Sequence, residues 1–285
     1  MPVKQYNPTT AGRRHSSVDA FADLTKKGKK GPEKKLTTAR RRKAGRNASG
    51  KITVRHQGGG AKRRLRVVDA VRDKFDVPAR VIAIEYDPSR GARLALLQYQ
   101  DGEKRYIVAP ADLPVGETIV CSKQKGEIKV GNRFSLEHIP AGINVFDVEI
   151  MPGKGGQIAR GAGASVALMA VEGAYATLKL PSGEVRLVAR ECMATIGSAS
   201  NQDRRLVRWG KAGRMRHRGI RPSVRGKVMN PVDHPHGGGE AKNSIGLVHP
   251  KTPQGKPALG VKTRRKQASD KFIVSRRPKG RFVGA

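Results

Sequence analysis

The central part of the chain begins with several short runs in which apolar and polar residues alternate. In the first run, Ile82, Ile84 and Tyr86 fall on one face, which is the period-two pattern of a half-buried β-strand. Turn residues separate the runs, and the tightest turn, at residues 100–103, predicts a hairpin. The strands predicted here are residues 80–86, 92–99, 104–109 and a last one that follows Gly116. Such short strands predict a small closed barrel of the oligonucleotide/oligosaccharide-binding (OB) type, although other small barrels share their period.

A second group of β-type runs follows. Turn signals separate these runs by about 8–12 residues, which again predicts a small barrel. The period-two pattern slips near Phe146, and residues 189–196 fit either a strand or a helical turn. No long helix is predicted anywhere in the chain, so the expected fold class is all-β. The predicted strands are residues 134–139, 143–150, 165–172, 175–180 and 185–188.

The two ends of the chain lack this patterning. Residues 1–50 hold few large apolar side chains, and glycine, proline, histidine and basic residues dominate from about Ser198 onward. Leu206, Trp209 and Met215 are expected to pack the start of the C-terminal segment against the barrel. The predicted organisation is a basic N-terminal extension (1–60), an OB-like barrel (61–122), a second barrel (123–198) and a basic C-terminal extension (199–285).

The 285 residues carry a formal net charge of +35, which is concentrated in the two extensions. Residues 1–60 contain 16 Lys and Arg against 3 acidic residues, and residues 199–285 contain 22 against 4. From Val67 to Ser198 the two signs balance at 16 each. Two long arms of one sign repel themselves unless an anion neutralises them. A polyanion is therefore the expected partner, with nucleic acid favoured over an anionic membrane, and residues 1–50 are expected to order on RNA.

Several classes of protein are disfavoured by what the sequence lacks. No apolar run approaches the roughly 20 residues that span a bilayer, and neither extension has an apolar face beside its charge. The first residues contain no apolar signal segment. Cys121 and Cys192 stand alone, which fits a reduced, cytoplasmic compartment and supports neither a disulfide framework nor a zinc site. No membrane partner is expected.

Residues 45–51 come close to the phosphate-binding loop pattern G-x-x-x-x-G-K-[ST]. The match fails at Ile52, where a hydroxyl should bind magnesium, and no apolar strand precedes the motif. A nucleoside triphosphate site is therefore disfavoured. The same residue types, continued by a short strand and by three glycines at residues 58–60, suit a backbone that lies close against phosphates.

Residues 224–242 form the most unusual stretch, with two prolines, three consecutive glycines and many polar side chains. Such a stretch forms neither a regular helix nor a central strand. Three interpretations of His234 and His236 compete. A metal site lacks a third and a fourth ligand at a usual spacing, and a general base made by His234 and Asp233 lacks a nucleophile. RNA contact is favoured, since imidazoles can donate to phosphate or 2′-OH groups.

The glycines at residues 237–239 support the RNA interpretation. Successive N–H groups that carry no side chains can form an anion-binding concavity. Glycine runs at residues 58–60 and 153–156 also stand next to Lys, Arg or His. Three such runs make flexible linkers the weaker interpretation.

Several motifs resemble those of one family. Residues 225–240 read Arg-Gly-x-x-Met-Asn-Pro-Val-Asp-His-Pro-His-Gly-Gly-Gly-Glu, which is similar to the signature of the universal large-subunit ribosomal protein two. Further matches follow the family's order and cover nearly the whole chain. They lie in residues 45–60, 84–88, 101–107, 152–160, 182–187, 210–214 and 270–274.

The resemblance implies two fused barrels, the first OB-like and the second SH3-like, bound to large-subunit ribosomal RNA. It implies a role in subunit association and a C-terminal arm that reaches toward the peptidyl transferase centre. His234 matches a family histidine linked to supporting peptidyl transfer, but the reaction belongs to the RNA, so the chain is expected not to be an enzyme. Whether His234 acts on protons or only holds RNA stays open, and the second role is favoured.

The implied partners are large-subunit ribosomal RNA, other ribosomal proteins and the small subunit across the interface. No cofactor is expected beyond RNA-associated Mg²⁺, and no residue is expected to be catalytic or to bind a metal. The expected location is cytoplasmic. The residues predicted to contact RNA are Arg46, Asn47, Arg55, His56, Gly58, Gly59, Gly60, Lys62, Lys154, Arg160, Lys211, Arg214, Arg225, Met229, Asn230, Asp233, His234, His236, Gly237, Gly238, Gly239 and Glu240.

Four places depart from the family pattern. Ala61 stands where His is expected, Ala241 where Gly is usual, and Gln254 where Trp is usual. Residues 215–218, Met-Arg-His-Arg, replace a less basic run. These departures put local contacts in doubt, above all stacking near Gln254.

Overall fold

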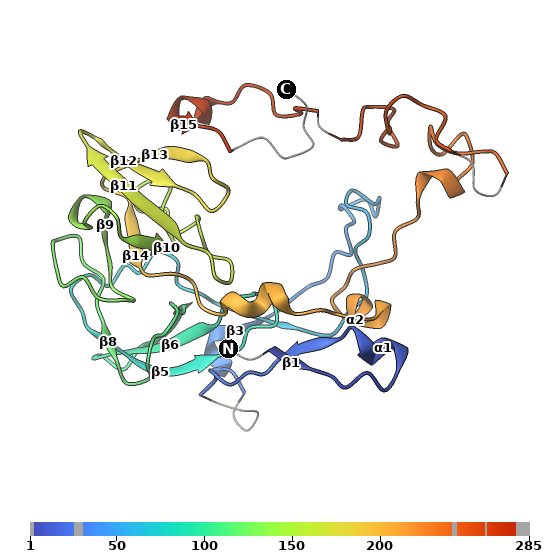
Figure 1. The fold of residues 1–285 in the computed structure, drawn as a ribbon. Coiled ribbons are helices and arrows are strands. Elements are labelled where there is room, and N and C mark those ends of the chain that lie inside the picture. The colour runs from blue at the N-terminus through green and yellow to red at the C-terminus, as the bar shows by residue number, and fades with distance from the viewer. Residues whose placement is uncertain (1–2, 26–30, 241–243, 260, 278–285) are drawn as a thin grey trace. The chain divides into compact units, whose positions relative to one another are not determined.

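The computed structural model describes residues 3–25, 31–240, 244–259 and 261–277. Strands dominate it, so the predicted all-β class is confirmed (Figure 1). Grouped by mutual contacts, the described residues in 3–41, 62–214 and 271–277 form one compact unit, which we call the barrel unit. Those in 42–61 and 215–270 form a second, which we call the loop unit. The domain boundaries predicted at residues 60, 122 and 198 divide the sequence into consecutive segments, whereas these two units group residues by contact. The predicted boundaries therefore stay predictions.

The first barrel is a four-stranded antiparallel sheet with the order β7-β6-β5-β8. Its alternating side chains pack inward, so that Val81, Leu97 and Ile119 are completely buried. The predicted hairpin is present, because the Tyr99 amide donates to the Glu103 carbonyl at 3.0 Å. The strands are β5 (Ala79–Glu85), β6 (Leu94–Tyr99), β7 (Lys104–Val108) and β8 (Thr118–Ile119).

The second barrel is a seven-stranded antiparallel sheet with the order β15-β13-β12-β11-β10-β14-β9. Its core includes Leu168 and Leu178, which are fully buried. The pattern slips near Phe146 because the next residue, Asp147, takes a positive φ of 50° and ends the strand. The strands are β9 (Arg133–Ser135), β10 (Asn144–Phe146), β11 (Val166–Glu172), β12 (Tyr175–Lys179), β13 (Val185–Ala189), β14 (Met193–Ile196) and β15 (Ile273–Ser275). The ambiguous residues 189–196 thus contain a strand.

Residues 1–50 contain more structure than their composition predicted. Strands β1 (Val3–Gln5) and β2 (Ser17–Asp19) pair around the short helix α1 (Ala11–Arg14). The side chain of Arg93, 1% exposed, holds this hairpin to the first barrel through ion pairs of 2.7 Å to Asp19 and 2.8 Å to Asp23. The expectation that this segment orders only on RNA was therefore wrong for the hairpin, and two of its few acidic residues are the reason.

The loop unit consists of two long loops whose ends belong to the barrel unit. Residues 42–61 connect the paired strands β3 (Thr37–Ala39) and β4 (Arg64–Arg66). The 3₁₀ turn η1 (Lys34–Leu36) directly precedes β3. Residues 215–270 begin within helix α2 (Ala212–His217) and end in η5 (Ala268–Phe272), after which β15 pairs with β13. The C-terminal segment was predicted to be irregular throughout, and β15 corrects this prediction.

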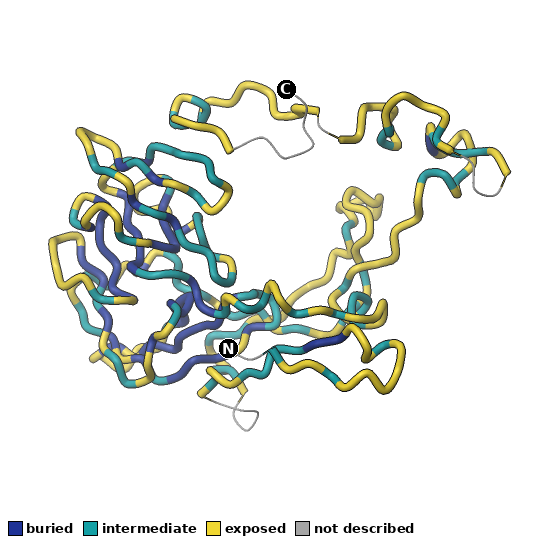
Figure 2. The backbone as a smooth tube through the Cα atoms, viewed as in Figure 1, coloured by how far each residue is buried: buried dark blue, intermediate teal, exposed yellow. Residues whose placement is uncertain are grey.

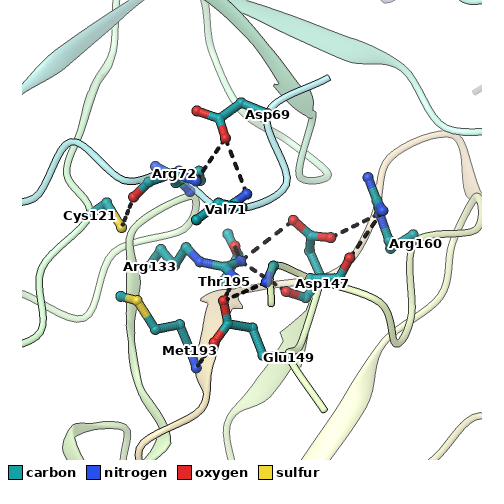
Figure 3. A network of polar contacts seen from close by, with 12 residues as sticks. Asp69, Val71, Arg72, Cys121, Arg133, Asp147, Glu149, Arg160, Met193 and Thr195 are labelled. Carbon is teal, nitrogen blue, oxygen red and sulfur yellow. Dashed lines mark hydrogen bonds and ion pairs between the residues drawn. The ribbon is translucent and has the colours of Figure 1, made fainter. Parts of the chain in front are cut away.

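A buried polar network joins the two barrels within the barrel unit (Figure 3). Arg133, fully buried, donates to the Asp147 carbonyl at 2.9 Å and pairs with Glu149 at 3.2 Å. Arg72, in the segment before the first barrel, donates to the Gly131 carbonyl at 3.1 Å beside the second. Burial lowers the pKa of Arg72. Burial also raises the pKa of Asp147, and the positive charges of Arg133 and Arg160 lower it by a smaller amount.

The same network shapes the glycine-rich loop at residues 151–157. Glu149 accepts the amides of Gly153 at 3.2 Å and Gly155 at 3.1 Å, and it also accepts the amide of Met193 at 3.2 Å. This loop carries Lys154, whose side chain is exposed. An interior carboxylate therefore fixes the backbone on which a predicted RNA-contact residue stands.

Both cysteines are free and buried. Burial raises the pKa of Cys192 to about 12, so its thiol is protonated at neutral pH. No helix in the described residues is both long and apolar enough to cross a bilayer.

Candidate nucleic-acid interface

The predicted RNA-contact residues divide between the two units. Lys62, Lys154, Arg160, Lys211 and Arg214 belong to the barrel unit, and all the others belong to the loop unit. The loop unit is largely exposed (Figure 2), and His234 is its one buried residue in the part of the chain described. The geometry around His234 therefore decides what this unit can do.

Residues 45–52 form a tight hairpin. Gly45, with a φ of +71°, accepts the amides of Thr53 and Val54, and Arg46 bridges to Ile52. The Asn47 carboxamide closes the turn by accepting the Lys51 amide at 2.9 Å. A phosphate-binding loop needs a strand, a loop and then a helix, so the near-match to that motif does not adopt its structure. Arg46 and Asn47 are exposed on the hairpin.

The glycines at residues 58–60 pack against a second backbone segment. The Gly58 amide donates to the Gly219 carbonyl at 2.9 Å, and the Ala61 amide donates to the His217 carbonyl at 2.8 Å. A Cβ atom on Gly60 would lie 2.8 Å from the Gly219 nitrogen, which is too close for any side chain. These glycines thus allow the two loops to join, and Ala61 takes part through its backbone.

Residues 225–240 are held in shape by their own backbone. The 3₁₀ turn η4 (Gly226–Val228) opens the loop, and the Gly238 amide returns to the Met229 carbonyl at 3.1 Å. The Asp233 amide donates to the Asn230 carbonyl at 3.0 Å. The loop therefore has a defined conformation without any partner.

The two histidines complete this framework. Nδ1 of His234, a side chain that is 7% exposed, accepts the His236 amide at 3.0 Å. Nε2 of His236 accepts the Lys251 amide at 2.8 Å, and the two ring centroids lie 4.7 Å apart. Each imidazole therefore uses one ring nitrogen as an acceptor within the loop.

These contacts fix the tautomer of His234. A neutral imidazole that accepts at Nδ1 carries its proton on Nε2. Nε2 can then donate a hydrogen bond, for example to an RNA phosphate, but it has no lone pair with which to accept a proton. Protonation at Nδ1 would set two N–H groups against each other and break the loop. The arrangement suits a positioning role and opposes a general-base role.

Neither alternative chemistry for this pair gains support. Among the described side chains, the Asp233 carboxylate makes no hydrogen bond to either imidazole. Within the described residues no three His, Cys, Asp or Glu side chains gather closely enough to hold a metal ion.

The His234 ring lies directly on the backbone of Gly226, where an added Cβ would stand 2.4 Å from Nδ1. We expect Gly226→Ala to displace the ring and break its bond with the His236 amide. Loss of one buried hydrogen bond costs about 1–3 kcal/mol, so hydrogen exchange at residues 234–238 should accelerate by about 5- to 150-fold. Hydrogen–deuterium exchange with mass spectrometry measures this. Gly213→Ala is the matched control, since nothing lies within 4 Å of its Cβ position; equal exchange in both variants would contradict the assigned packing.

Several charged or polar side chains of the loop are exposed, whereas Lys227 is partly buried. Arg225, Asn230, Asp233 and Glu240 are all exposed. The loop thus separates two tasks, because its backbone and imidazoles hold the shape while its exposed side chains remain available for a partner.

Within the loop unit, the two loops line a hollow of about 940 Å³. Cationic side chains on its wall include Arg46, Arg55 and Arg221, and apolar ones include Ile52 and Val224, which are both 59% exposed. Guanidinium groups bind phosphates and stack on bases, and apolar side chains cover base faces. The hollow has the chemistry of an RNA-binding surface.

The structure also corrects parts of the sequence interpretation. The amides of Gly237 and Gly238 donate to carbonyls of the loop itself, so they do not form the expected anion-binding concavity. Arg160 bonds internally to Asp147, and Arg214 to the Ser17 carbonyl. For these residues contact with RNA stays a prediction, beside an internal role that is now visible.

Two contributors were missed from the sequence. Arg221 borders the hollow and donates its amide to the His56 carbonyl at 2.9 Å. Lys251 supplies the amide that fixes His236. Arg221 could have been found as one more cation in a basic stretch, whereas no sequence pattern marks a backbone amide. Gln254 lies in an exposed turn in which the Gly255 amide donates to the Thr252 carbonyl.

Two family models match the chain. The model described as Ribosomal Proteins L2, RNA binding N-terminal domain, matches residues 33–121. The model described as Ribosomal Proteins L2, C-terminal domain, matches residues 129–255. Together they cover the first barrel, the second barrel apart from β15, and most of the loop unit, including residues 225–240.

Proposed function

Because this chain belongs to the ribosomal protein L2 family, we propose that its loop unit holds ribosomal RNA in place around the peptidyl transferase centre. Membership itself makes the chain a ribosomal protein that binds RNA in the large subunit. The proposal concerns where the loop unit acts and how. We further propose that the protein takes part in contact with the small subunit, alongside other ribosomal proteins, and that it works in the cytoplasm.

The observation that carries the proposal is the preformed loop around His234. Its backbone and imidazole bonds hold the shape, and the side chains of Arg225, Asn230, Asp233 and Glu240 are exposed. A surface ordered before binding loses less conformational entropy when it binds. The exposed cations Arg225, on this loop, and Arg46, Arg55 and Arg221, around the hollow, can then neutralise phosphates of RNA segments that would otherwise repel each other. Such a loop is suited to fixing RNA, and the chemical step belongs to the RNA.

His234 is proposed to act as a positioning residue. Its Nδ1 is engaged within the loop, and its Nε2–H is left to donate to an RNA acceptor. This proposal favours the second of the two roles that the sequence left open.

The test replaces residues 225–240 with a Gly/Ser linker of equal length in large subunits assembled without the natural protein. The variant should still sediment with large subunits, because the barrel unit is intact. Nucleotides around the peptidyl transferase centre should become more reactive to dimethyl sulfate, and association with small subunits should be measured in the same particles. A Gly/Ser replacement of the exposed residues 123–126 is the control. Unchanged reactivity around the centre would refute the proposed location.

A further inference from the structure

A second basic cavity lies in the barrel unit, and none of its lining residues is among the predicted RNA-contact residues. It has a volume of about 470 Å³, within the range of about 300–1,000 Å³ that small-ligand pockets span. One wall comes from the hairpin of β1 and β2, and the other from η3 (Gln202–Leu206) and the residues that follow. Its lining residues are Val3, Gln5, Tyr6, Arg14, His15, Ser16, Ser17, Arg205, Leu206 and Arg208.

The two walls are joined by main-chain bonds, so the cavity is formed before any ligand binds. The Ser17 amide donates to the Arg208 carbonyl at 2.8 Å, and the Arg208 amide donates to the Ser17 hydroxyl at 2.8 Å. Tyr6 is held by the guanidinium of Arg214, which lies 5.3 Å from the ring centroid. These contacts keep the cavity open at a fixed width.

The charge of the cavity is uncompensated. Arg14, Arg205 and Arg208 are exposed, none of the lining residues is acidic, and the described residues make no ion pair with any of the three guanidinium groups. Like charges gathered at one place repel each other unless an anion neutralises them. The cavity is therefore complementary to an anion with more than one negative charge.

The cavity also has an apolar surface that is exposed to solvent in the free protein. Leu206 was expected from the sequence to pack against the barrel, and this was wrong, since it is 57% exposed. Together with Val3 and the edge of Tyr6 it forms an apolar patch beside the three arginines. Phosphate alone would need no such patch, whereas a base beside its phosphates would cover it.

We propose that this cavity binds one unpaired nucleotide of RNA. The base lies on Leu206 and Val3, and its own and neighbouring phosphates contact Arg14, Arg205 and Arg208. The inference rests on the RNA-binding function but concerns a site outside the loop unit. An acidic peptide offers the same charge, but its carboxylates are not attached to a flat ring that covers the apolar patch.

The probe is a uridine pentanucleotide with 4-thiouridine at its centre, cross-linked by light to the full-length protein and mapped by mass spectrometry. Adducts are expected on residues 3–6 and 205–208. Leu206→Ser should lower the yield there by about tenfold, in line with the loss of one base contact. Val115→Ser, which changes a side chain 47% exposed in the barrel unit and outside the cavity, is the matched control and should leave that yield unchanged. Circular dichroism confirms that both variants fold.

Several outcomes would overturn the inference. A pentanucleotide abasic at its centre should compete poorly, and equal competition would show that only phosphates are bound. Equal displacement by polyglutamate would assign the cavity to acidic peptides. Adducts confined to the loop unit would remove this site and leave the proposed function intact, whereas no RNA bound anywhere would overturn both.

Discussion

Replacing Glu149 with glutamine is expected to lower the free energy of unfolding of the barrel unit by about 3–5 kcal/mol, because it leaves the buried Arg133 charge with only the more distant carboxylate of Asp147, at 3.5 Å. One oxygen of Glu149 accepts from Arg133 and Gly155, and the other accepts from Gly153 and Met193. The glutamine NH₂ group can only donate. Whichever way the amide turns, it faces two donors and loses two hydrogen bonds.

Urea unfolding of the RNA-free protein, followed by circular dichroism, measures this effect. Glu172→Gln is the matched control, since Glu172 is exposed on β11 and the same change should stay within about 0.5 kcal/mol. Equal losses in the two variants would show that water, and not Arg133, solvates Glu149 in solution. The loop at residues 151–157 would then need another explanation for its shape.

The barrels were predictable from the sequence because their strands are long enough to show a period. Residues 80–86 alternate and coincide within one residue with β5. Strand β15 spans only Ile273–Ser275, which is too short to display a period, and it forms because the edge of β13 is available. The hairpin of β1 and β2 depends on Arg93, a residue far along the chain. Pairings of this kind arise from tertiary structure and leave no local signal.

The candidate site was predictable in its residues but not in its geometry. Composition and the motif at residues 225–240 pointed to RNA. The burial of His234 depends on the absent side chain of Gly226, and the state of His236 depends on the Lys251 amide. The hydrogen bonds that engage Nδ1 of His234 and Nε2 of His236 therefore became visible only in the structure.

Loss of the His234 ring is expected to have the largest functional effect of any single change in the loop unit. His234→Ala removes the acceptor for the His236 amide and empties the only buried position of the described loop unit. An unsatisfied buried donor costs about 1–3 kcal/mol, which is enough to melt a loop that has few other contacts. Large subunits assembled with this variant should retain the protein and lose most of their peptidyl transfer activity.

Two near-isosteric variants separate position from proton chemistry. In His234→Asn the side-chain oxygen can take the place of Nδ1 and accept the His236 amide. In His234→Gln the side-chain NH₂ can take the place of Nε2, but the acceptor near the backbone is lost. Neither of these amide side chains is protonated or deprotonated near neutral pH. The preformed loop should therefore survive in the first variant and fail in the second.

Peptide-bond formation by large subunits reconstituted with His234→Asn, compared with His234→Gln and the natural chain, tests the central claim most directly. If His234 holds RNA through a preformed loop, the asparagine variant should keep activity within about tenfold of the natural chain, corresponding to about 1.4 kcal/mol. The glutamine variant should fall to the level of His234→Ala. Equal and complete loss in the asparagine and glutamine variants, with loop exchange unchanged in the asparagine variant, would contradict the claim that His234 acts through the preformed shape of the loop.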